Sequence, residues 1–233
     1  VLWWRVSDRY AAVKAVCESG DLSLASWREG MAPATGVWEK SKGNPVSEAD
    51  LAVDALLKQR LGDLAPNIGW LSEETVDHPD RLSMSRQWLV DPIDGTRDYI
   101  RGRSGWCVSV ALVEGSEAVF AAMYAPVTKQ LWVAHKGEGT TCNGKRLFAS
   151  TRSEFIGARV PTDALPKVDR DLEMVHKPNS IAMRMTMVAC DRADLVATLD
   201  GCSGYGRIDL CGSQRKEVHS GIRKRKYGRS QTG

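Results

Sequence analysis

Three features are missing from this sequence, and each absence excludes a class of protein. The chain has no long apolar run, since charge-free windows such as residues 118–128 reach about 11 residues and a membrane-spanning helix needs roughly 18. The six cysteines form no C-x-x-C pair, and no histidine stands at zinc-ligand spacing. Residues 1–5 lack the basic start and cleavage site of a secretory signal. We therefore expect reduced thiols in a cytoplasmic protein, with no membrane partner.

An excess of one charge is also missing from most of the chain. Apolar residues make up 42% and charged residues 26% of the 233 residues, which is typical of a globular protein and excludes a disordered chain. The net charge of +3 is uneven, because residues 214–233 hold seven Lys and Arg against one acid and the remainder carries −3. For the basic run at residues 223–226, a solvated tail is favoured over contact with RNA or membrane phosphates. No nucleic-acid polymer is expected as a partner.

Composition divides the chain into two parts. After Gly201, glycines, cysteines and basic residues dominate, and Trp132 is the last tryptophan. A stretch of this kind buries little apolar surface. We expect a folded domain over residues 1–200 and an atypical basic C-terminal segment over residues 201–233.

Periodicity and capping signals predict helices at residues 8–27, from Ser47 onward, and at residues 180–199. In the second helix, Ser47 is the expected N-cap and Asp50 lies in the first turn, where the helix dipole favours a carboxylate. The expected apolar positions of the three helices are Ala12, Ala15, Val16, Ser19 and Leu22; Val53, Leu56, Leu57, Leu61 and Leu64; and Ile181, Met185, Val188 and Leu195.

Short apolar runs predict a sheet. The runs at residues 68–71 and 87–90 each end in acidic residues, so we expect two buried strands with carboxylates at their C-terminal ends. Further runs between residues 106 and 134, separated by turn signals, predict a multi-stranded and largely antiparallel sheet. The pair Asn143-Gly144 predicts a type I′ hairpin.

The segment Asp-Pro-Ile-Asp-Gly-Thr at residues 91–96 is the sharpest chemical feature. The fixed φ of proline and the sharp turn open to glycine would hold Asp91 and Asp94 close together on a rigid loop. Close carboxylates repel unless a cation binds, and hard ions such as Mg²⁺ prefer oxygen ligands, including a carbonyl such as that of Ile93. The N–H groups of Gly95 and Thr96 could bind an anion such as phosphate. Taken alone, the same segment is an ordinary turn.

Two further acidic segments favour a metal site over an ordinary turn. Glu73 and Glu74 follow the apolar run at residues 68–71, and Asp50 stands at a helix start. Singly, an acidic pair is solvated surface and a first-turn acid is a cap. Three such segments together favour a metal-binding cluster. Lys40 and Lys42 could approach an anionic substrate, although exposure to solvent is the default for lysine.

These segments resemble those of a known family. Residues 71–75, 91–96 and 47–50 are similar to the G-E-E-S, D-P-I-D-G-T and T-x-x-D segments of the inositol monophosphatase family of Mg²⁺-dependent, Li⁺-sensitive phosphatases. The resemblance covers residues 8–199, including the strand and hairpin within residues 106–147. It implies an α/β (α+β) sugar-phosphatase fold, layered α/β/α/β/α with predominantly antiparallel sheets, for a phosphatase domain at residues 1–200.

The resemblance also implies roles for individual residues. Glu73, Asp91, Asp94 and the Ile93 carbonyl would bind two or three Mg²⁺ ions, for which Mn²⁺ can substitute. In the reaction, Asp50 would act on a further metal or its waters, Glu74 would support the ligands, and Thr96 would orient the attacking water. The amides of Gly95 and Thr96 would bind the phosphate.

Two departures from the family pattern affect these expectations. Ser72 replaces the glycine before the two glutamates, which is tolerable because that residue is not a ligand. The W-D-x-A-A-G segment, which supplies another metal-binding aspartate, has its nearest counterpart in Asp209 within residues 207–212. Either Asp209 is a metal ligand or the chain has lost one.

The expected function is that of a Mg²⁺-dependent phosphomonoesterase acting on a small phosphorylated substrate. Residues 96–100 resemble the 3′(2′),5′-bisphosphate nucleotidases more than the inositol phosphatases, which favours release of the 3′-phosphate of adenosine 3′,5′-bisphosphate. Inositol monophosphate and sugar phosphates are alternatives. A phosphatase-fold protein with little or no activity, through loss of the C-terminal ligand, is another. Family members are often homodimers, so the resemblance allows a homodimer for this chain, and the sequence does not decide its oligomeric state.

Overall fold

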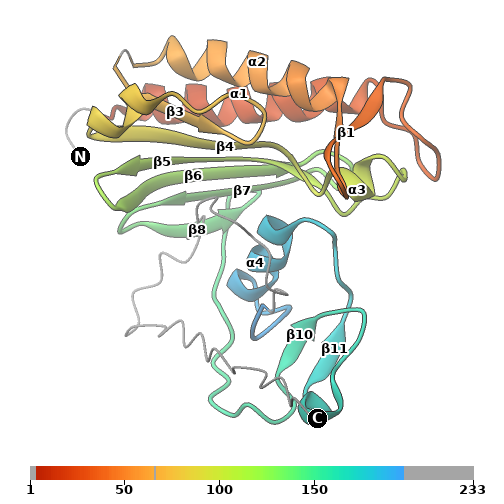
Figure 1. Ribbon diagram of the computed structural model, residues 1–233. Helices are drawn as coiled ribbons and strands as arrows, with labels where there is room; N and C mark the ends of the chain where they lie inside the picture. The colour runs from red at the N-terminus through yellow and green to blue at the C-terminus, as the bar shows by residue number, and fades with distance from the viewer. Residues whose placement is uncertain (1–3, 66, 197–233) are drawn as a thin grey trace, which may run out of the picture.

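A seven-stranded sheet forms the centre of the molecule (Figure 1). The computed structural model describes residues 4–65 and 67–196. The strand order is β3-β4-β5-β6-β7-β8-β9, and neighbouring strands are antiparallel except for the parallel pair β3 and β4. The strands are β3 (Gly69–Ser72), β4 (Arg86–Asp94), β5 (Cys107–Glu114), β6 (Glu117–Ala125), β7 (Gln130–His135), β8 (Gly139–Cys142) and β9 (Lys145–Arg146).

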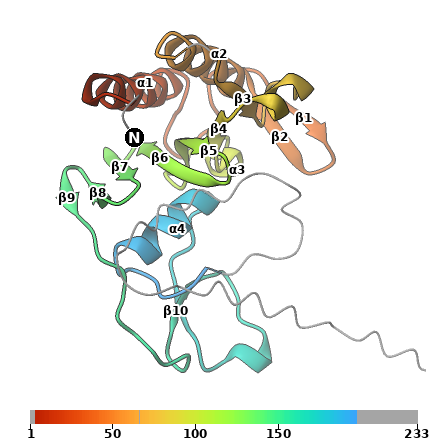
Figure 2. The same ribbon diagram turned by 90° about the vertical axis from the view of Figure 1, so that its left-hand side faces the viewer.

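Two helices lie side by side on one face of this sheet (Figures 1 and 2). They are α1 (Val6–Leu24) and α2 (Glu48–Gly62), which confirms the first two predicted helices. Helix α1 buries four of its five expected positions, but Leu22 is 41% exposed. Ser47 is the N-cap of α2 and forms a capping box with Asp50, as expected.

The main core lies between these helices and the sheet. Val53, Leu57 and Leu61 of α2 are fully buried there, against an aromatic cluster from the sheet. In this cluster the rings of Trp88 and Phe120 meet edge to face with centroids 6.3 Å apart. The apolar stripe read from the α2 sequence is therefore the face that holds the helix to the sheet.

The opposite face of the sheet carries a second set of elements (Figure 1). Helix α4 (Ile181–Ala189) packs there, and beyond it lies the parallel pair β10 (Arg159–Pro161) and β11 (Glu173–Val175), joined through the short helix η2 (Lys167–Asp169). The layers α/β/α/β and the largely antiparallel central sheet confirm the predicted α/β class. Within residues 4–65 and 67–196 the expected last helical layer has no counterpart.

The third predicted helix is shorter than expected and buries a different face. Helix α4 ends at Ala189 rather than near residue 199, and Asp191 follows with a left-handed φ of 58°. Its buried residues are Ala182, Thr186 and Ala189. The expected positions Ile181, Met185 and Val188 are only partly buried. Small side chains let a helix approach a sheet closely, so the small face of α4 is the one that packs.

Shorter elements complete the described chain. Strands β1 (Val37–Ser41) and β2 (Asn44–Ser47) form an antiparallel hairpin, η1 (Pro79–Ser83) precedes β4, and α3 (Thr96–Tyr99) follows it. Asn143 and Gly144 have φ values of 48° and 77°, which confirms the predicted type I′ turn. Cys17, Cys107, Cys142 and Cys190 are free thiols. None of the helices within residues 4–65 and 67–196 combines the length and apolar character needed to cross a membrane.

Candidate active site

Two parallel strands place the first pair of acids next to each other. Strands β3 and β4 pair with Ser72 opposite Val90, and the Glu73 amide donates a hydrogen bond to the Val90 carbonyl at 3.3 Å. Glu73 is the residue after β3, and Asp91 is the residue after Val90 in β4. The two acids therefore lie side by side, just past the last paired residues of the two strands. The prediction that acids stand at the ends of two apolar strands is therefore confirmed.

The second aspartate of the motif does not lie on a loop, contrary to the expectation from its sequence. Strand β4 continues through Asp94, which pairs with Cys107 of β5. The register is irregular between Asp91 and Asp94, and Pro92, which has no N–H to give to a ladder, lies in this interval. An irregular strand, rather than a rigid loop, thus sets the spacing of the two carboxylates.

Gly95 ends this strand in a conformation that only glycine adopts easily. Its φ is 98°, and a Cβ atom added there would lie 2.7 Å from the Gly105 carbonyl oxygen and 3.0 Å from the Ser180 nitrogen. The carbonyl of Gly95 accepts the first hydrogen bonds of α3, from Asp98 and Tyr99. The turn after the motif therefore depends on both the backbone freedom and the small size of Gly95.

Asp50 reaches the motif from the start of helix α2. Its side chain is 1% exposed, and its Oδ2 atom accepts hydrogen bonds from the Ser47 amide at 2.8 Å and the Ser47 hydroxyl at 2.6 Å. The Thr96 Oγ1 atom lies 3.3 Å from Asp50 Oδ1 and 3.0 Å from the Ile93 carbonyl oxygen. Thr96 therefore joins the first turn of α2 to the motif, and the structure brings these three predicted residues together.

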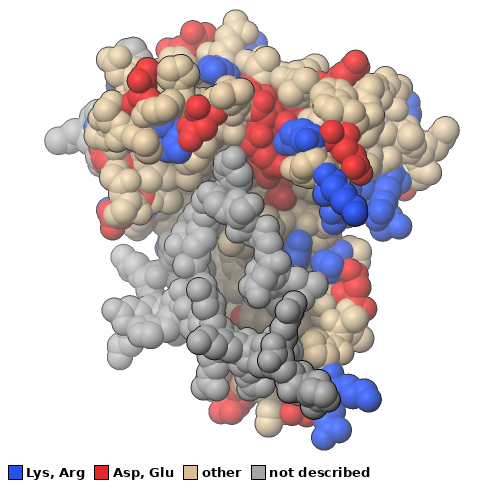
Figure 3. All heavy atoms as spheres, viewed as in Figure 1, with Lys and Arg blue, Asp and Glu red and all other residues tan. Residues whose placement is uncertain are grey.

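The acids of the cluster repel one another. Removal from solvent raises the pKa of Asp91 well above its ordinary value, and the charges of Asp94, Glu73, Asp50 and Glu74 raise it further. Burial likewise raises the pKa of Asp50 and of Glu74. Asp and Glu side chains gather on this side of the molecule, with Lys and Arg beside them (Figure 3). A site that concentrates negative charge in this way favours a bound cation.

One cation of the chain already lies against this cluster. The Lys40 Nζ atom is 2.7 Å from Glu74 Oε1 and 3.3 Å from Glu73 Oε1, and its side chain is 27% exposed. Burial alone would lower the pKa of Lys40, but its hydrogen bonds and charge contacts with the two glutamates raise it. Lys40 is an exposed residue, as the default for lysine has it, but its ammonium group is also paired with both glutamates. The signal for this contact was the pair of adjacent acids, which needs a counter-charge.

Asp94 is turned toward the second set of elements. Its Oδ2 atom accepts hydrogen bonds from the Ser180 hydroxyl and the Ala182 amide, both at 2.7 Å, and its Oδ1 atom accepts from the Ile181 amide at 3.2 Å. Burial raises the pKa of Asp94 despite these hydrogen bonds. The first turn of α4 is thus held by the carboxylate that was predicted as a metal ligand, and sequence reasoning missed this use.

The chemistry of the donor set fits a hard divalent cation. The side chains of Asp50, Glu73, Glu74, Asp91 and Asp94 supply carboxylate oxygens, and Ile93 supplies a carbonyl. In the described residues, no group of three or more His, Cys, Asp or Glu is arranged to hold a metal ion. Three of these carboxylates have partners within the chain instead, since Lys40 contacts Glu73 and Glu74 and the start of α4 contacts Asp94. The remaining predicted ligand, Asp209, lies outside the described residues.

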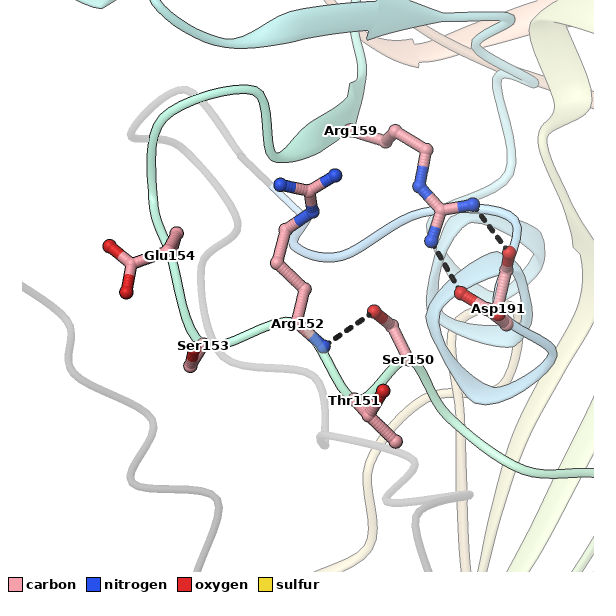
Figure 4. A pocket seen from close by; sticks show the side chains of 7 residues that line it. All are labelled: Ser150, Thr151, Arg152, Ser153, Glu154, Arg159 and Asp191. Atoms are coloured by element: carbon pink, nitrogen blue, oxygen red, sulfur yellow. Dashed lines mark hydrogen bonds and ion pairs between the residues drawn. The ribbon is translucent and has the colours of Figure 1, made fainter.

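A cavity away from the acid cluster is a poor candidate for the active site. It has a volume of about 400 Å³ and is lined by Ser150, Thr151, Arg152, Ser153, Glu154, Arg159 and Asp191 (Figure 4). The Arg159 side chain is bound to Asp191 and also to Asp194, whose Oδ2 atom is 2.9 Å from Arg159 Nε. Arg152 Nε is 3.4 Å from the same Asp194 oxygen. The cations of this cavity are therefore already neutralised by acids.

Known proteins resemble the chain in sequence and in fold. It is 30% identical over 172 residues to Nus factor SuhB of Xylella fastidiosa, which covers 68% of this chain and 62% of that protein. It is 32% identical over 174 residues to the 3′(2′),5′-bisphosphate nucleotidase CysQ of Shigella flexneri, covering 68% of each. The crystal structure of extragenic suppressor protein suhB from Bartonella henselae superposes with a TM-score of 0.68 at 23% identity, over 80% of this chain and 76% of that one.

The family profile agrees with these similarities and with the motif. The profile of the inositol monophosphatase family matches residues 6–212. This span includes every element that carries the acid cluster, from α2 to α4. The chain is therefore a member of the inositol monophosphatase family.

Proposed function

We propose that this chain is a metal-dependent phosphomonoesterase that uses Mg²⁺. The observation that carries the proposal is the convergence of Asp50, Glu73 and Asp91 with the Ile93 carbonyl and Thr96 where β3, β4 and α2 meet. When bound, Mg²⁺ activates water and neutralises charge on the phosphate. The matched part spans less than two thirds of the Xylella relative, so the activity rests on these residues rather than on similarity alone.

Thr96 and Asp50 have suitable positions for handling the proton of an attacking water. The Thr96 hydroxyl has one proton to donate, with the Ile93 carbonyl at 3.0 Å and Asp50 Oδ1 at 3.3 Å as acceptors, and either bond leaves lone pairs on Oγ1 to accept a hydrogen bond from water. Burial raises the pKa of Asp50, so its carboxylate is a better proton acceptor than an exposed aspartate. We assign Thr96 to orientation of the water and Asp50 to acceptance of its proton.

The remaining predicted residues would bind the metal and the phosphate or support the metal ligands. Glu73, Asp91 and Asp94 would ligate the metal together with the Ile93 carbonyl. Glu74 would support these ligands through its ion pair with Lys40. The amides of Gly95 and Thr96 stand at the start of α3 and are assigned to the phosphate. Asp209 is assigned as a further ligand, since the family match extends past it to residue 212.

For the substrate we propose adenosine 3′,5′-bisphosphate. The similarity to CysQ of Shigella flexneri supports this choice, whereas the similarity to inositol monophosphatase 2 of Solanum lycopersicum, 27% identical over 202 residues, supports inositol monophosphate as the alternative. Asp98, part of the segment that favoured the nucleotidases, is 8% exposed and accepts a hydrogen bond from the Asn179 amide at 3.0 Å. Its contribution to selectivity would come through the position of residues 179–182.

Measurement of phosphate release by this chain tests both the metal-dependent mechanism and the proposed substrate. With Mg²⁺, we expect kcat/KM for adenosine 3′,5′-bisphosphate to exceed that for inositol 1-phosphate at least tenfold, about 1.4 kcal/mol of transition-state discrimination. EDTA and the variant Asp91→Asn should each abolish release. Equal rates on the two substrates would overturn the substrate assignment only. Full turnover in EDTA would overturn the metal-dependent mechanism.

A further inference from the structure

A second buried aspartate lies one helical turn beyond Asp50. Asp54 is 7% exposed and stands on the inner side of α2, beside the fully buried Val53 and close to Leu57 in sequence. Burial of a carboxylate in an apolar environment costs free energy unless hydrogen bonds compensate it. The partners of Asp54 therefore indicate what this residue does.

Both oxygens of Asp54 are bound to the segment that carries the glutamate pair. The Ser72 hydroxyl donates to Asp54 Oδ1, and the Thr75 hydroxyl donates to Asp54 Oδ2. Ser72 Oγ also accepts a hydrogen bond from the Glu74 amide at 3.2 Å. The two hydroxyls come from the residues immediately before and after the glutamates. Asp54 thus fastens both ends of a four-residue segment to helix α2.

We infer that Asp54 is a positioning residue that fixes Glu73 and Glu74 for metal binding, an inference that rests on the proposed function. Glu73 follows β3 without a further strand partner beyond its bond to Val90, so the direction of its side chain depends on how residues 72–75 are held. Lys40 contacts the glutamates from the hairpin side, and Asp54 holds their backbone from the helix side.

The serine at position 72 gives this arrangement a feature of its own. Residues 71–75 resemble a family segment with glycine where this chain has Ser72, and glycine has no hydroxyl to donate to Asp54. What seemed a tolerable replacement from the sequence is one of the two links between the glutamate segment and α2. Supporting groups of this kind commonly contribute about 10- to 100-fold to metal affinity.

Mn²⁺ binding to the 233-residue chain, followed by the electron paramagnetic resonance signal of free Mn²⁺, tests the inference without reference to activity. We expect Asp54→Ala to raise the dissociation constant about tenfold. Asp54→Asn should stay within about threefold of the wild type, because an amide oxygen can accept from Ser72 and an amide N–H can donate to Thr75. Ser72→Ala should weaken binding, and adding it to Asp54→Ala should have little further effect, since both remove the same link.

Asp8→Ala is the matched control for loss of a buried carboxylate. Asp8 lies in the first turn of α1 and accepts a hydrogen bond from the Arg5 amide at 3.1 Å, so its loss should reduce stability but leave Mn²⁺ affinity unchanged. Wild-type affinity in Asp54→Ala, or an equal loss in Asp8→Ala, would overturn the inference, as would failure of Asp54→Asn to retain binding. If Asp54→Ala does not fold, Ser72→Ala and Thr75→Val carry the same test. Absence of Mn²⁺ binding by the wild type would instead refute the proposed function.

Discussion

At the scale of single residues, Asp91 is an acid whose charge opposes folding when no metal is bound. Its pKa is raised by burial and by four neighbouring acids, so the folded state binds its proton more tightly than the unfolded state does. Stability of the metal-free protein is then lost as pH rises from about 4, the ordinary range of an unfolded aspartate, through the raised pKa. The same acid that would bind a cation therefore destabilises the metal-free protein.

We expect Asp91→Asn to raise the melting temperature of the metal-free protein at pH 7 and to have almost no effect near pH 4. The amide removes the like-charge repulsion at neutral pH, whereas at pH 4 the folded aspartate is protonated and the unfolded one is about half protonated, so little of the repulsion remains to be removed. Each kcal/mol gained corresponds to about 2–4 °C for a domain of this size. Thermal unfolding in EDTA at the two pH values measures the effect.

The exposed Asp171 provides the control for this experiment. Asp171→Asn should leave the melting temperature nearly unchanged at both pH values, because the substitution removes no buried charge. A fall in stability of Asp91→Asn at pH 7 would contradict the electrostatic account of the cluster.

Gly95 carries a second prediction at the same scale. Gly95→Ala would place a Cβ atom within 3.1 Å of three backbone atoms, of Gly105, Ser180 and Trp106, at a φ of 98°. Backbone strain of this kind costs about 1–3 kcal/mol, and backbone atoms cannot move aside as a flexible side chain can. Urea unfolding should show the loss, and Gly115→Ala, also at positive φ but with open space around it, should cost less.

At the scale of elements, the start of α4 depends on a contact between distant parts of the chain. The Ser180 hydroxyl donates to Asp94, accepts from the Met183 amide at 2.9 Å, and so links the helix cap to β4. We expect Ser180→Ala to lower the free energy of unfolding by about 1–2 kcal/mol, since it removes the N-cap and one partner of a buried carboxylate. Amide hydrogen exchange should increase at Ile181 and Ala182.

Thr128→Ala is a suitable control, because the exposed Thr128 hydroxyl makes only local contacts, including one to the Ala125 carbonyl at 3.4 Å. Its effect on unfolding should stay below about 0.5 kcal/mol. Unchanged exchange at α4 in Ser180→Ala would show that Asp94 does not need this hydroxyl to hold the helix.

Elements defined by nearby residues could be predicted from the sequence. The cap at Ser47, the turn at Asn143 and Gly144, and the stripe of α2 each depend on residues a few positions apart, and all three are confirmed. The buried face of α4 could not be predicted, because it depends on which layer the helix meets. The direction of Asp94 was equally hidden, since its partner Ser180 lies 86 positions away.

In the candidate site, too, features set by nearby residues could be predicted and features set by distant contacts could not. The types of its acids follow from sequence pattern, and Glu73 follows β3 as expected, whereas Asp91 and Asp94 lie within β4 rather than on a loop after it. The hydroxyl partners of Asp54 and the ammonium partner of Glu74 are long-range contacts with no local signature. An acid on the apolar side of α2, four residues after Asp50, was the available sign that Asp54 needed partners.

At the scale of the whole molecule, metal binding should stabilise the fold, because it relieves repulsion among acids contributed by three separate elements. At a metal concentration one hundred times the dissociation constant, the gain is about 2.7 kcal/mol. We expect a rise of roughly 5–10 °C in the melting temperature on adding Mg²⁺. No change at millimolar Mg²⁺ would contradict metal binding by this cluster.

Asp209 lies outside the described residues, and its role stays a prediction. If it is a ligand, Asp209→Ala should reduce the Mg²⁺-dependent rise in melting temperature while leaving the metal-free melting temperature near that of the wild type. The neighbouring Arg207→Ala serves as the control and should keep the full rise. A wild-type response of Asp209→Ala to Mg²⁺ would mean that the ligand set is complete without this aspartate.

The Lys40 ammonium group has a consequence for how the site fills. Because it lies within 3.3 Å of carboxylate oxygens on both glutamates, the chain itself supplies a positive charge to the cluster. Loading with a divalent ion is then a cation exchange rather than the capture of an ion by bare negative charge. The resident counter-ion is covalently attached through hairpin β1–β2 and cannot diffuse away. The effective free energy of metal binding is therefore the difference between the binding of the metal ion and the binding of the Lys40 ammonium group. Substitutions in the hairpin that weaken the Lys40 contact would change the metal affinity without altering any ligand.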